Sequence, residues 1–248
     1  MSKKAIVGRD RSLPSVLRAG GALDASWLGR VAYERAWSLQ RQIFFGRLDG
    51  DRRDSLLLLE HPHTYTLGKR SQPGDLVYGE ALRRKKGIAV HEVDRGGRAT
   101  YHGPGQLVGY PIMALGERYD VMRYLRNLEE VLIRTAAEMG VAAHRDEDHT
   151  GVWVGPNKIG AIGVKITRGI TMHGFAFNVD PDLTMFEGIV PCGIRDRWVT
   201  SIAAEAGAAP SVERAATVAA GHLAEVFERT LVWSNPASVA PVEEPVLG

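Results

Sequence analysis

The order of strand-like and helix-like segments constrains the fold of this chain more than any other feature of its sequence. Residues 88–112 and 151–179 are rich in strand-forming residues and are interrupted by glycine. One helical segment separates these two stretches, whereas a doubly wound parallel sheet alternates strands with helices. The order therefore predicts an α/β protein of the α+β type, a single domain whose mixed, largely antiparallel sheet is flanked by helices.

The spacing of apolar residues predicts where the helices lie. Asp24 is a candidate N-cap, and the apolar residues after it recur at helical spacing, which predicts a helix over residues 25–45. A second helix is expected from an N-cap at Asp120 to a glycine terminator at Gly140. The remaining expected elements are a buried strand at 55–60, a hairpin around the turn at 155–157, and helices near 200–206 and 211–229.

Residues 169–179 alternate in the way that a strand does. Regular alternation places His173, Phe175 and Phe177 on one face, with Gly174 and Ala176 on the other. A slot with a floor of small residues and walls of phenylalanine would suit an alkyl chain. A plain core strand would show nearly the same pattern, so the alternation alone does not decide between the two.

Composition and length set the class of protein. The chain has 248 residues and a net charge of +2, which gives no sign of a nucleic-acid-binding surface. We expect one folded domain over 21–232, between flexible ends at 1–20 and 233–248. There is no apolar stretch of membrane-spanning length, no secretory leader and only one cysteine, so we expect a cytoplasmic monomer. The histidine spacing predicts no metal site, and no cofactor is expected.

Cys192 is the only cysteine, and Pro191 and Gly193 flank it. A lone cysteine is usually a small buried hydrophobic residue. The flanking residues instead predict an irregular loop that a ligand can approach closely. A thiol there becomes a good nucleophile if a nearby cation or base raises its thiolate fraction. On the residues alone, the candidate cations are Lys158, Lys165, Arg195 and Arg197, and the candidate bases are His102 and His173.

Two glycine-rich segments are candidates for lining a ligand site. The segment RGGRATYHGPGQL at 95–107 offers main-chain groups to a ligand but lacks the spacing of a phosphate-binding loop. A tight hairpin with bulges is the alternative interpretation. The segment KIGAIGVKI at 158–166 places small residues along a strand, which marks the close approach of a ligand or of another backbone.

Five motifs together resemble the lipoyl(octanoyl) transferase family in order and spacing. They are RGGxxTYHGPGQLVGYPI from Arg95, KIGAIGV from Lys158, HGFAFNV from His173, PCGI from Pro191 and VTS from Val199. The similarity extends from about residue 27 to 230. The fold of this family resembles the catalytic domain of biotin and lipoate protein ligases, which agrees with the mixed sheet predicted above.

The resemblance implies an acyltransferase that takes an octanoyl (or lipoyl) group from acyl carrier protein. The acceptor would be a specific lysine of lipoyl domains in 2-oxoacid dehydrogenase E2 subunits and in the glycine cleavage H protein, the first step of endogenous protein lipoylation. The resemblance makes Cys192 the nucleophile of an acyl-enzyme thioester and Lys158 its catalytic partner. The implied substrate-binding residues are Arg95, Gly96, Gly97, Arg98, Ala99, Thr100, Tyr101, His102, Ala161, Ile162, Gly163, His173, Gly174, Phe175 and Ala176.

Two further expectations concern the substrates. Burial of an octanoyl chain stabilises the complex by roughly 5–6 kcal/mol at ~0.8 kcal/mol per methylene, which gives only about fourfold discrimination per methylene. Strict selection of eight carbons therefore needs a closed pocket end, which the sequence does not show. Basic residues would steer acidic macromolecular substrates. These residues are Lys69, Arg70, Arg83–Lys86, Arg95 and Arg98.

Three alternatives remain open at this point. An ATP-dependent lipoate or biotin ligase on the same fold activates a free acid as its adenylate and needs no cysteine. A cysteine thioesterase would pair Cys192 with His102 or His173 and release free octanoate. A non-catalytic fatty-acid-binding module would never form a covalent adduct.

Overall fold

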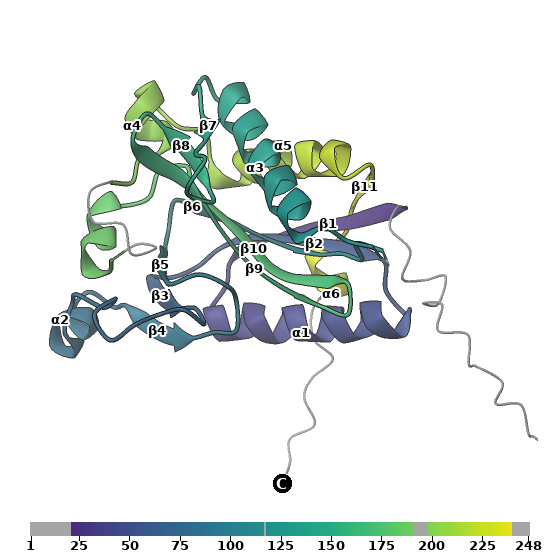
Figure 1. The fold of residues 1–248 in the computed structure, drawn as a ribbon, viewed down its shortest axis with the longest axis horizontal. Coiled ribbons are helices and arrows are strands. Elements are labelled where there is room, and N and C mark those ends of the chain that lie inside the picture. The colour runs from purple at the N-terminus through teal and green to yellow at the C-terminus, as the bar shows by residue number, and fades with distance from the viewer. Residues whose placement is uncertain (1–20, 117, 191–197, 240–248) are drawn as a thin grey trace, which may run out of the picture.

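The computed structural model describes residues 21–116, 118–190 and 198–239. An eight-stranded sheet runs through the protein in the order β11-β1-β2-β6-β10-β9-β8-β7 (Figure 1). Strands β11, β1 and β2 are parallel, and every other neighbouring pair is antiparallel, which confirms the predicted fold class. The strands are β1 (Ala22–Arg30), β2 (Asp54–Glu60), β6 (Gln106–Ile112), β7 (His144–Arg145), β8 (Val152–Val154), β9 (Asn157–Thr167), β10 (Ile170–Asn178) and β11 (Thr230–Trp233).

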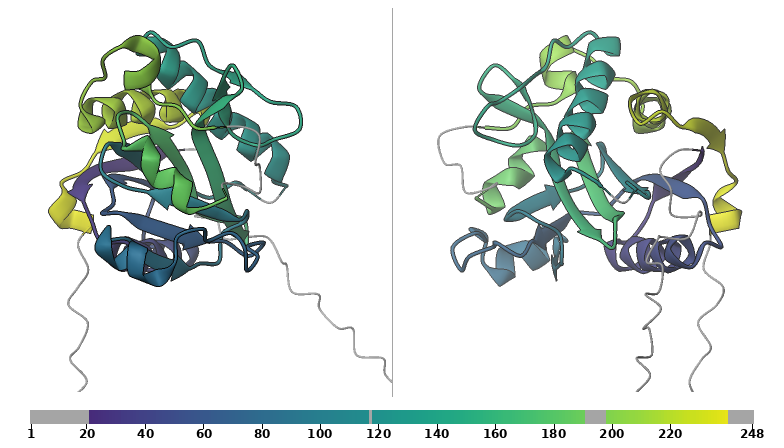
Figure 2. Two further views of the ribbon diagram at one scale, coloured as in Figure 1. Left: turned by 90° about the vertical axis from the view of Figure 1, so that its left-hand side faces the viewer. Right: turned by 45° about the vertical axis from the view of Figure 1, so that its right-hand side comes forward.

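Helices cover both faces of this sheet (Figures 1 and 2). Helices α3 and α5 pack against each other and against one face, while α1 lies along the other. The helices are α1 (Tyr33–Asp49), α2 (Glu80–Lys85), α3 (Val121–Glu138), α4 (Ile202–Ala206), α5 (Val212–Val226), α6 (Pro236–Val239) and the 3₁₀ helix η2 (Leu183–Gly188). Across the described ranges, none of these helices is both long and apolar enough to cross a bilayer.

A second, three-stranded sheet lies beside α1. Its order is β4 (Ala89–Glu92), β3 (Thr64–Leu67) and β5 (Ala99–His102). Tyr65 and Tyr101 form its core with Phe186 of η2. The sequence predicted strands here but not that they pair apart from the large sheet. This small sheet carries the glycine-rich loop that faces β9 and β10.

Most predicted elements are found where the sequence places them. Strand β2 is buried along almost its whole length because it pairs with β1 on one side and β6 on the other. Helix α3 begins at Asp120, whose carboxylate accepts hydrogen bonds from the Met122 and Arg123 N–H groups at 2.8 and 3.2 Å. It ends before Gly140, whose φ of +79° is the left-handed conformation that glycine adopts readily.

The helix predicted over residues 25–45 is wrong in its first half. Residues 22–30 form β1, and α1 begins only at Tyr33. Leu23 and Ala25 are fully buried on alternate positions of β1, and Trp27 pairs with Leu58 of β2. Hydrogen bonding to two neighbouring strands outweighs an apolar spacing that fits a helix equally well. Asp24 therefore lies in a strand and caps no helix.

A buried carboxylate joins four separate parts of the chain. Asp54 of β2 accepts hydrogen bonds from Arg47 of α1 at 2.7 Å and from Arg229, before β11, at 2.9 Å. It also accepts from the Ala114 N–H at 2.9 Å, and all three charged side chains are almost completely buried. This cluster fixes α1 and the C-terminal part of the domain to the central strands.

We predict that Asp54→Ala lowers the free energy of unfolding by about 3–5 kcal/mol, because it leaves two buried guanidinium groups without their carboxylate. Chemical denaturation monitored by circular dichroism measures this loss. The control is Glu80→Ala, which removes an exposed pair with Arg84 on α2 and should cost less than about 1 kcal/mol. Equal effects of the two substitutions would contradict the role given to Asp54.

Candidate functional site

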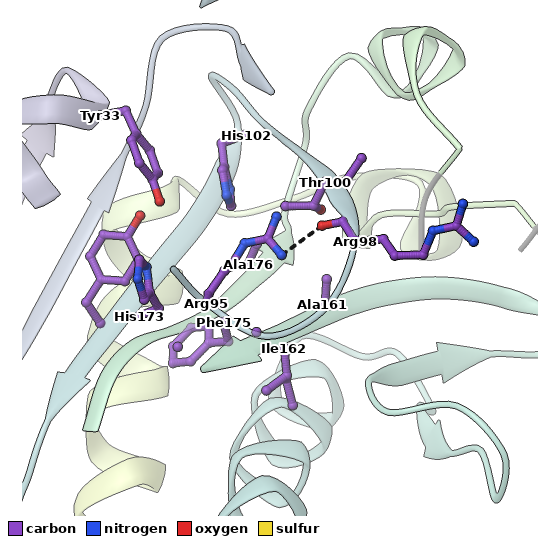
Figure 3. Close-up of a pocket in the computed structure, with 15 residues that line it drawn as sticks. Tyr33, Arg95, Arg98, Thr100, His102, Ala161, Ile162, His173, Phe175 and Ala176 are labelled. Carbon is purple, nitrogen blue, oxygen red and sulfur yellow. Dashed lines mark hydrogen bonds between the residues drawn. The ribbon is translucent and has the colours of Figure 1, made fainter. Parts of the chain in front are cut away.

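Two adjoining cavities lie where the small sheet faces β9 and β10. The first is enclosed by the 95–102 segment, the middle of β9 and β10, and two tyrosines from α1 and β6. The second lies beside it and contains the Lys158 side chain. Thr100, Ala161 and Ala176 line both cavities, so the two adjoin at these residues. Figure 3 shows Thr100 and Ala161 on one side of Arg95, with Tyr33 and His173 on the other.

The predicted pocket residues converge on the first cavity, although they come from three strands of two sheets. Every predicted substrate-binding residue lines it except Gly96 and Tyr101. Tyr101 points away, and its hydroxyl lies 2.8 Å from His63 Nδ1 in the core of the small sheet. The Gly96 N–H donates to the Val164 carbonyl of β9 at 2.9 Å, so Gly96 joins the two sheets without lining the cavity.

Tyr33 and Tyr110 also line the first cavity, and sequence reasoning missed both. Tyr33 was assigned to the interior of the wrongly predicted 25–45 helix, and it is in fact the first residue of α1. Tyr110 lies in the GQLVGYPI part of a recognised motif. Because β6 pairs with β10 at Gly109 and Phe175, Tyr110 lies level with the predicted pocket residue Gly174. That pairing was the signal that could have identified it.

Arg95 holds the loop that closes the first cavity. Its guanidinium donates hydrogen bonds to the carbonyls of Gly96, Arg98 and Thr66 at 2.8–3.0 Å and to the Thr66 hydroxyl at 2.7 Å. Its aliphatic stem lies on Gly163, where a Cβ atom would stand 3.0 Å from Arg95 Cδ. The side chain is 6% exposed, so the predicted role of Arg95 in steering acidic substrates is wrong.

The other candidate steering residues differ in their surroundings. Arg98 forms an ion pair with the buried carboxylate of Asp75. Lys69 and Arg70 are exposed, and the basic run at 83–86 is partly or fully exposed on and just after α2. A solvated surface accounts for this run, and its role in steering stays a prediction.

His173 lies on the opposite face from the one that alternation predicted. Its φ of +56° is a left-handed conformation within β10, and this breaks the regular alternation. The His173 N–H donates to Gln40 of α1 at 2.8 Å, whereas Phe175 and Phe177 pack in the core beneath α3 and α5. Its Nε2 lies 2.8 Å from Asp94 Oδ1, and burial lowers the pKa of His173 against the opposing effect of that carboxylate.

A chain of hydrogen bonds fixes the proton on His102. The Thr200 carbonyl can only accept, so the Asn178 amide donates to it, and the Asn178 oxygen accepts from Gln106, each at 2.9 Å. The remaining Gln106 oxygen accepts from His102 Nδ1 at 2.9 Å. Burial, with a smaller contribution from His61, holds the pKa of His102 well below 6.5. His102 is therefore a neutral imidazole with its hydrogen on Nδ1, not a cation that could stabilise a thiolate.

Lys158 is the cation of the second cavity. It is 7% exposed, and its ammonium donates to the Thr150 carbonyl at 3.3 Å and lies 4.6 Å from the centre of the Trp153 ring. The adjacent Gly151 N–H donates to the buried carboxylate of Glu129 at 3.0 Å. Helix α3 thereby fixes the loop against which the lysine lies. Lys165, another candidate cation, is paired with Asp94 and lines neither cavity.

Cys192, Arg195 and Arg197 lie outside the described residues, but both flanks of their segment are placed. Before it, the Val190 N–H donates to the Asp75 carbonyl at 3.0 Å. After it, residues 198–200 pair with Lys158: its N–H donates to the Trp198 carbonyl and its carbonyl accepts from Thr200, both at 2.9 Å. Phe186 on one flank and Val199 on the other line the second cavity.

Comparison with known proteins agrees with this geometry. The lipoyl protein ligase A/B catalytic-domain family model matches residues 32–224. A protein of Chloroflexus aurantiacus named octanoyltransferase is 49% identical over 83% of this chain and 94% of its own length. One from Mycobacterium leprae with the same name is 44% identical over 92% of this chain and 97% of its own length.

Solved structures show the same fold at low sequence identity. Lipoate-protein ligase A bound with ATP superposes with a TM-score of 0.71 at 17% identity, covering 88% of this chain and 92% of the other. A bipartite lipoate protein ligase from Thermoplasma acidophilum gives a TM-score of 0.70 at 18% identity, covering 90% and 91%. The family match and the close relatives show that this chain belongs to the lipoyl protein ligase A/B catalytic-domain family, as a member of its octanoyltransferase group.

Proposed function

We propose that this protein is an octanoyltransferase that works through a thioester on Cys192. Octanoyl-acyl carrier protein is the donor, and a lysine of lipoyl domains is the acceptor. The observation that carries the proposal is the pairing of residues 198–200 with Lys158, beside a cavity lined by small residues. This pairing ties one end of the cysteine segment to the lysine that the family resemblance makes its partner.

Covalent geometry supports the placement of the thiol near the cavities. Cys192 follows Val190 by two residues, so their Cα atoms are at most about 7.6 Å apart. Val190 is held beside Asp75, which also binds Arg98 of the loop that lines the first cavity. The two residues that flank the segment of Cys192 are therefore held in place, Val190 beside this loop and Trp198 beside Lys158.

The proposed first step is acyl transfer to the enzyme. The Cys192 thiolate, stabilised by the Lys158 ammonium, attacks the octanoyl thioester carbonyl. The bond between the acyl carbon and the carrier sulfur breaks, and the carrier leaves as a thiol after taking a proton from Lys158, which is then a neutral amine. The octanoyl chain lies along the small residues that the two cavities share, Ala161 and Ala176.

The proposed second step returns the cysteine to its starting state. The amine of the lipoyl-domain lysine attacks the thioester, an amide bond forms, and the carbon–sulfur bond to Cys192 breaks. Lys158 takes the proton that the amine loses. His102 and His173 are neutral and hydrogen-bonded in place, which fits pocket walls better than the paired base of a cysteine thioesterase.

The first prediction concerns the covalent intermediate. Incubation with octanoyl-acyl carrier protein should add about 126 Da to the intact protein, the mass gained when an octanoyl group replaces the thiol hydrogen. Peptide mass spectrometry should place the increment on Cys192, and hydroxylamine should remove it. Subsequent addition of a lipoyl domain should move the same mass to one lysine of that domain.

Two results would contradict this mechanism. ATP-dependent lipoylation that survives Cys192→Ser would favour a ligase that uses an adenylate. Release of free octanoate without transfer to the lipoyl domain would favour a thioesterase. The folded state of Cys192→Ser, measured by circular dichroism, is the control.

The second prediction concerns Lys158. Lys158→Ala should slow both thioester formation and transfer to the lipoyl domain by at least about 100-fold, because it removes the thiolate-stabilising charge and the base. The Cys192 thiol should also titrate at a higher pKa, measured by alkylation rate against pH. Lys165→Ala is the matched control on the same strand and should retain near wild-type rates. An unchanged thiol titration in Lys158→Ala would show that the lysine does not act electrostatically on the cysteine.

A further inference from the structure

We infer that Tyr33 closes the far end of the acyl cavity and sets the length of the chain that the enzyme accepts. The inference rests on the proposed function and adds the closed end that strict chain-length selection requires. It depends on where the cavity ends, on what holds Tyr33 there, and on how far an acyl chain reaches.

The two cavities have a defined direction along β9 and β10. Lys158 and Asn178 line the second cavity, whereas Gly163 and His173 line only the first. Strand register places Ala161 opposite Ala176 between these ends. Tyr33 lies with His173 at the end away from Thr100 and Ala161 (Figure 3). A chain that enters beside Lys158 therefore points towards Tyr33.

An octanoyl chain is about as long as the stretch of β9 between Lys158 and Ala161. Ala161 and Gly163 follow Lys158 by three and five residues, which is about 10 and 17 Å along a strand. An extended octanoyl group is about 9 Å long, since each carbon–carbon bond of ~1.5 Å advances the chain by about 1.3 Å. Measured from Lys158, its methyl end reaches about as far as Ala161, where the two cavities adjoin. Two to four further carbons would extend it towards Tyr33.

Tyr33 is held rigidly by its neighbours. Its ring is 3% exposed and stacks between His91, at 5.2 Å and 17°, and His102, at 6.1 Å and 18°. Tyr110 also lines the cavity, and its hydroxyl lies 2.8 Å from His61 Nε2. A longer acyl chain would have to separate this stack.

Tyr33, Tyr110 and His61 form the end wall of the cavity, and the direction of the hydrogen bond between Tyr110 and His61 is fixed. His61 Nδ1 lies 2.6 Å from the Val31 carbonyl, which can only accept, so His61 Nε2 must accept from Tyr110. Burial raises the pKa of Tyr33 to about 12 and lowers that of His61 to about 4. Tyr33 and His61 therefore each keep one protonation state between these two values.

The test compares octanoyl-, decanoyl- and dodecanoyl-acyl carrier protein as donors. The measured quantity is kcat/KM for thioester formation, followed by intact mass spectrometry. Wild type should prefer octanoyl over dodecanoyl. Tyr33→Ala should raise the dodecanoyl-to-octanoyl ratio at least tenfold, because the cavity then extends into the space of the ring. Tyr33→Phe keeps the ring and should leave that ratio close to the wild-type value.

Two further variants make the result specific to the end wall. Tyr33→Trp should lower octanoyl transfer relative to hexanoyl transfer, because the larger ring shortens the cavity. This variant tests the end wall without creating a void. Phe45→Ala alters an exposed aromatic residue of the same helix and should leave all rates unchanged. If Tyr33→Ala does not fold by circular dichroism, Tyr33→Trp alone decides the question.

The outcomes separate this inference from the proposed function. A wild type that transfers octanoyl and dodecanoyl equally well, or an unchanged ratio in folded Tyr33→Ala and Tyr33→Trp, overturns the inference and leaves the acyltransferase intact. A folded wild type that acquires no acyl group from any donor overturns both.

Discussion

The contact between the 94–98 loop and strand β9 is the interaction on which the site depends. The Gly96 N–H donates to the Val164 carbonyl, and the stem of Arg95 lies on Gly163. A Cβ atom at Gly163 would also stand 3.3 Å from the Gly96 carbonyl, so a larger residue would require the loop to shift by a few tenths of an ångström. The buried guanidinium of Arg95 then holds the loop to Thr66 of the small sheet. The cavity lies where these two sheets meet across the Arg95 side chain and the small residues of β9 and β10.

In this arrangement, the residues that bind the acyl chain differ from those that take part in the reaction. The walls of the first cavity combine small residues with the hydrogen-bonded side chain of Arg95, and its histidines are fixed by Gln106 and Asp94. The Lys158 ammonium lies at the other end, where Glu129 holds the loop that receives it and residues 198–200 lie along its strand. In the proposed function, the Lys158 ammonium acts where the thioester forms, and the acyl chain lies along Ala161 and Ala176.

Local sequence patterns predicted much of this fold, and the exceptions have physical reasons. The capped helix from Asp120 and the buried strand at 55–60 were predicted because their signals are local. Residues 22–30 were misassigned because pairing with β2 and β11, which are distant in sequence, decides their conformation. The face of His173 was missed because a positive φ at a non-glycine residue leaves no mark in the sequence.

The candidate site was predicted through motif resemblance rather than through spacing. Spacing alone left four cations and two histidines as partners for Cys192, and the resemblance selected Lys158. Tyr33 and Tyr110 escaped both approaches, since one lay in a misassigned helix and the other is brought level with the pocket by the pairing of β6 with β10. Long-range pairing, which decides such positions, cannot be read from one sequence.

A crystal structure of the protein after reaction with octanoyl-acyl carrier protein tests the central claim most directly. We expect electron density that joins the Cys192 sulfur to an octanoyl chain, with the chain passing between Ala161 and Ala176 and its methyl group directed towards Tyr33. An octanoyl chain bound elsewhere, or one attached to a residue other than Cys192, would contradict the account of the cavity and of the thiol.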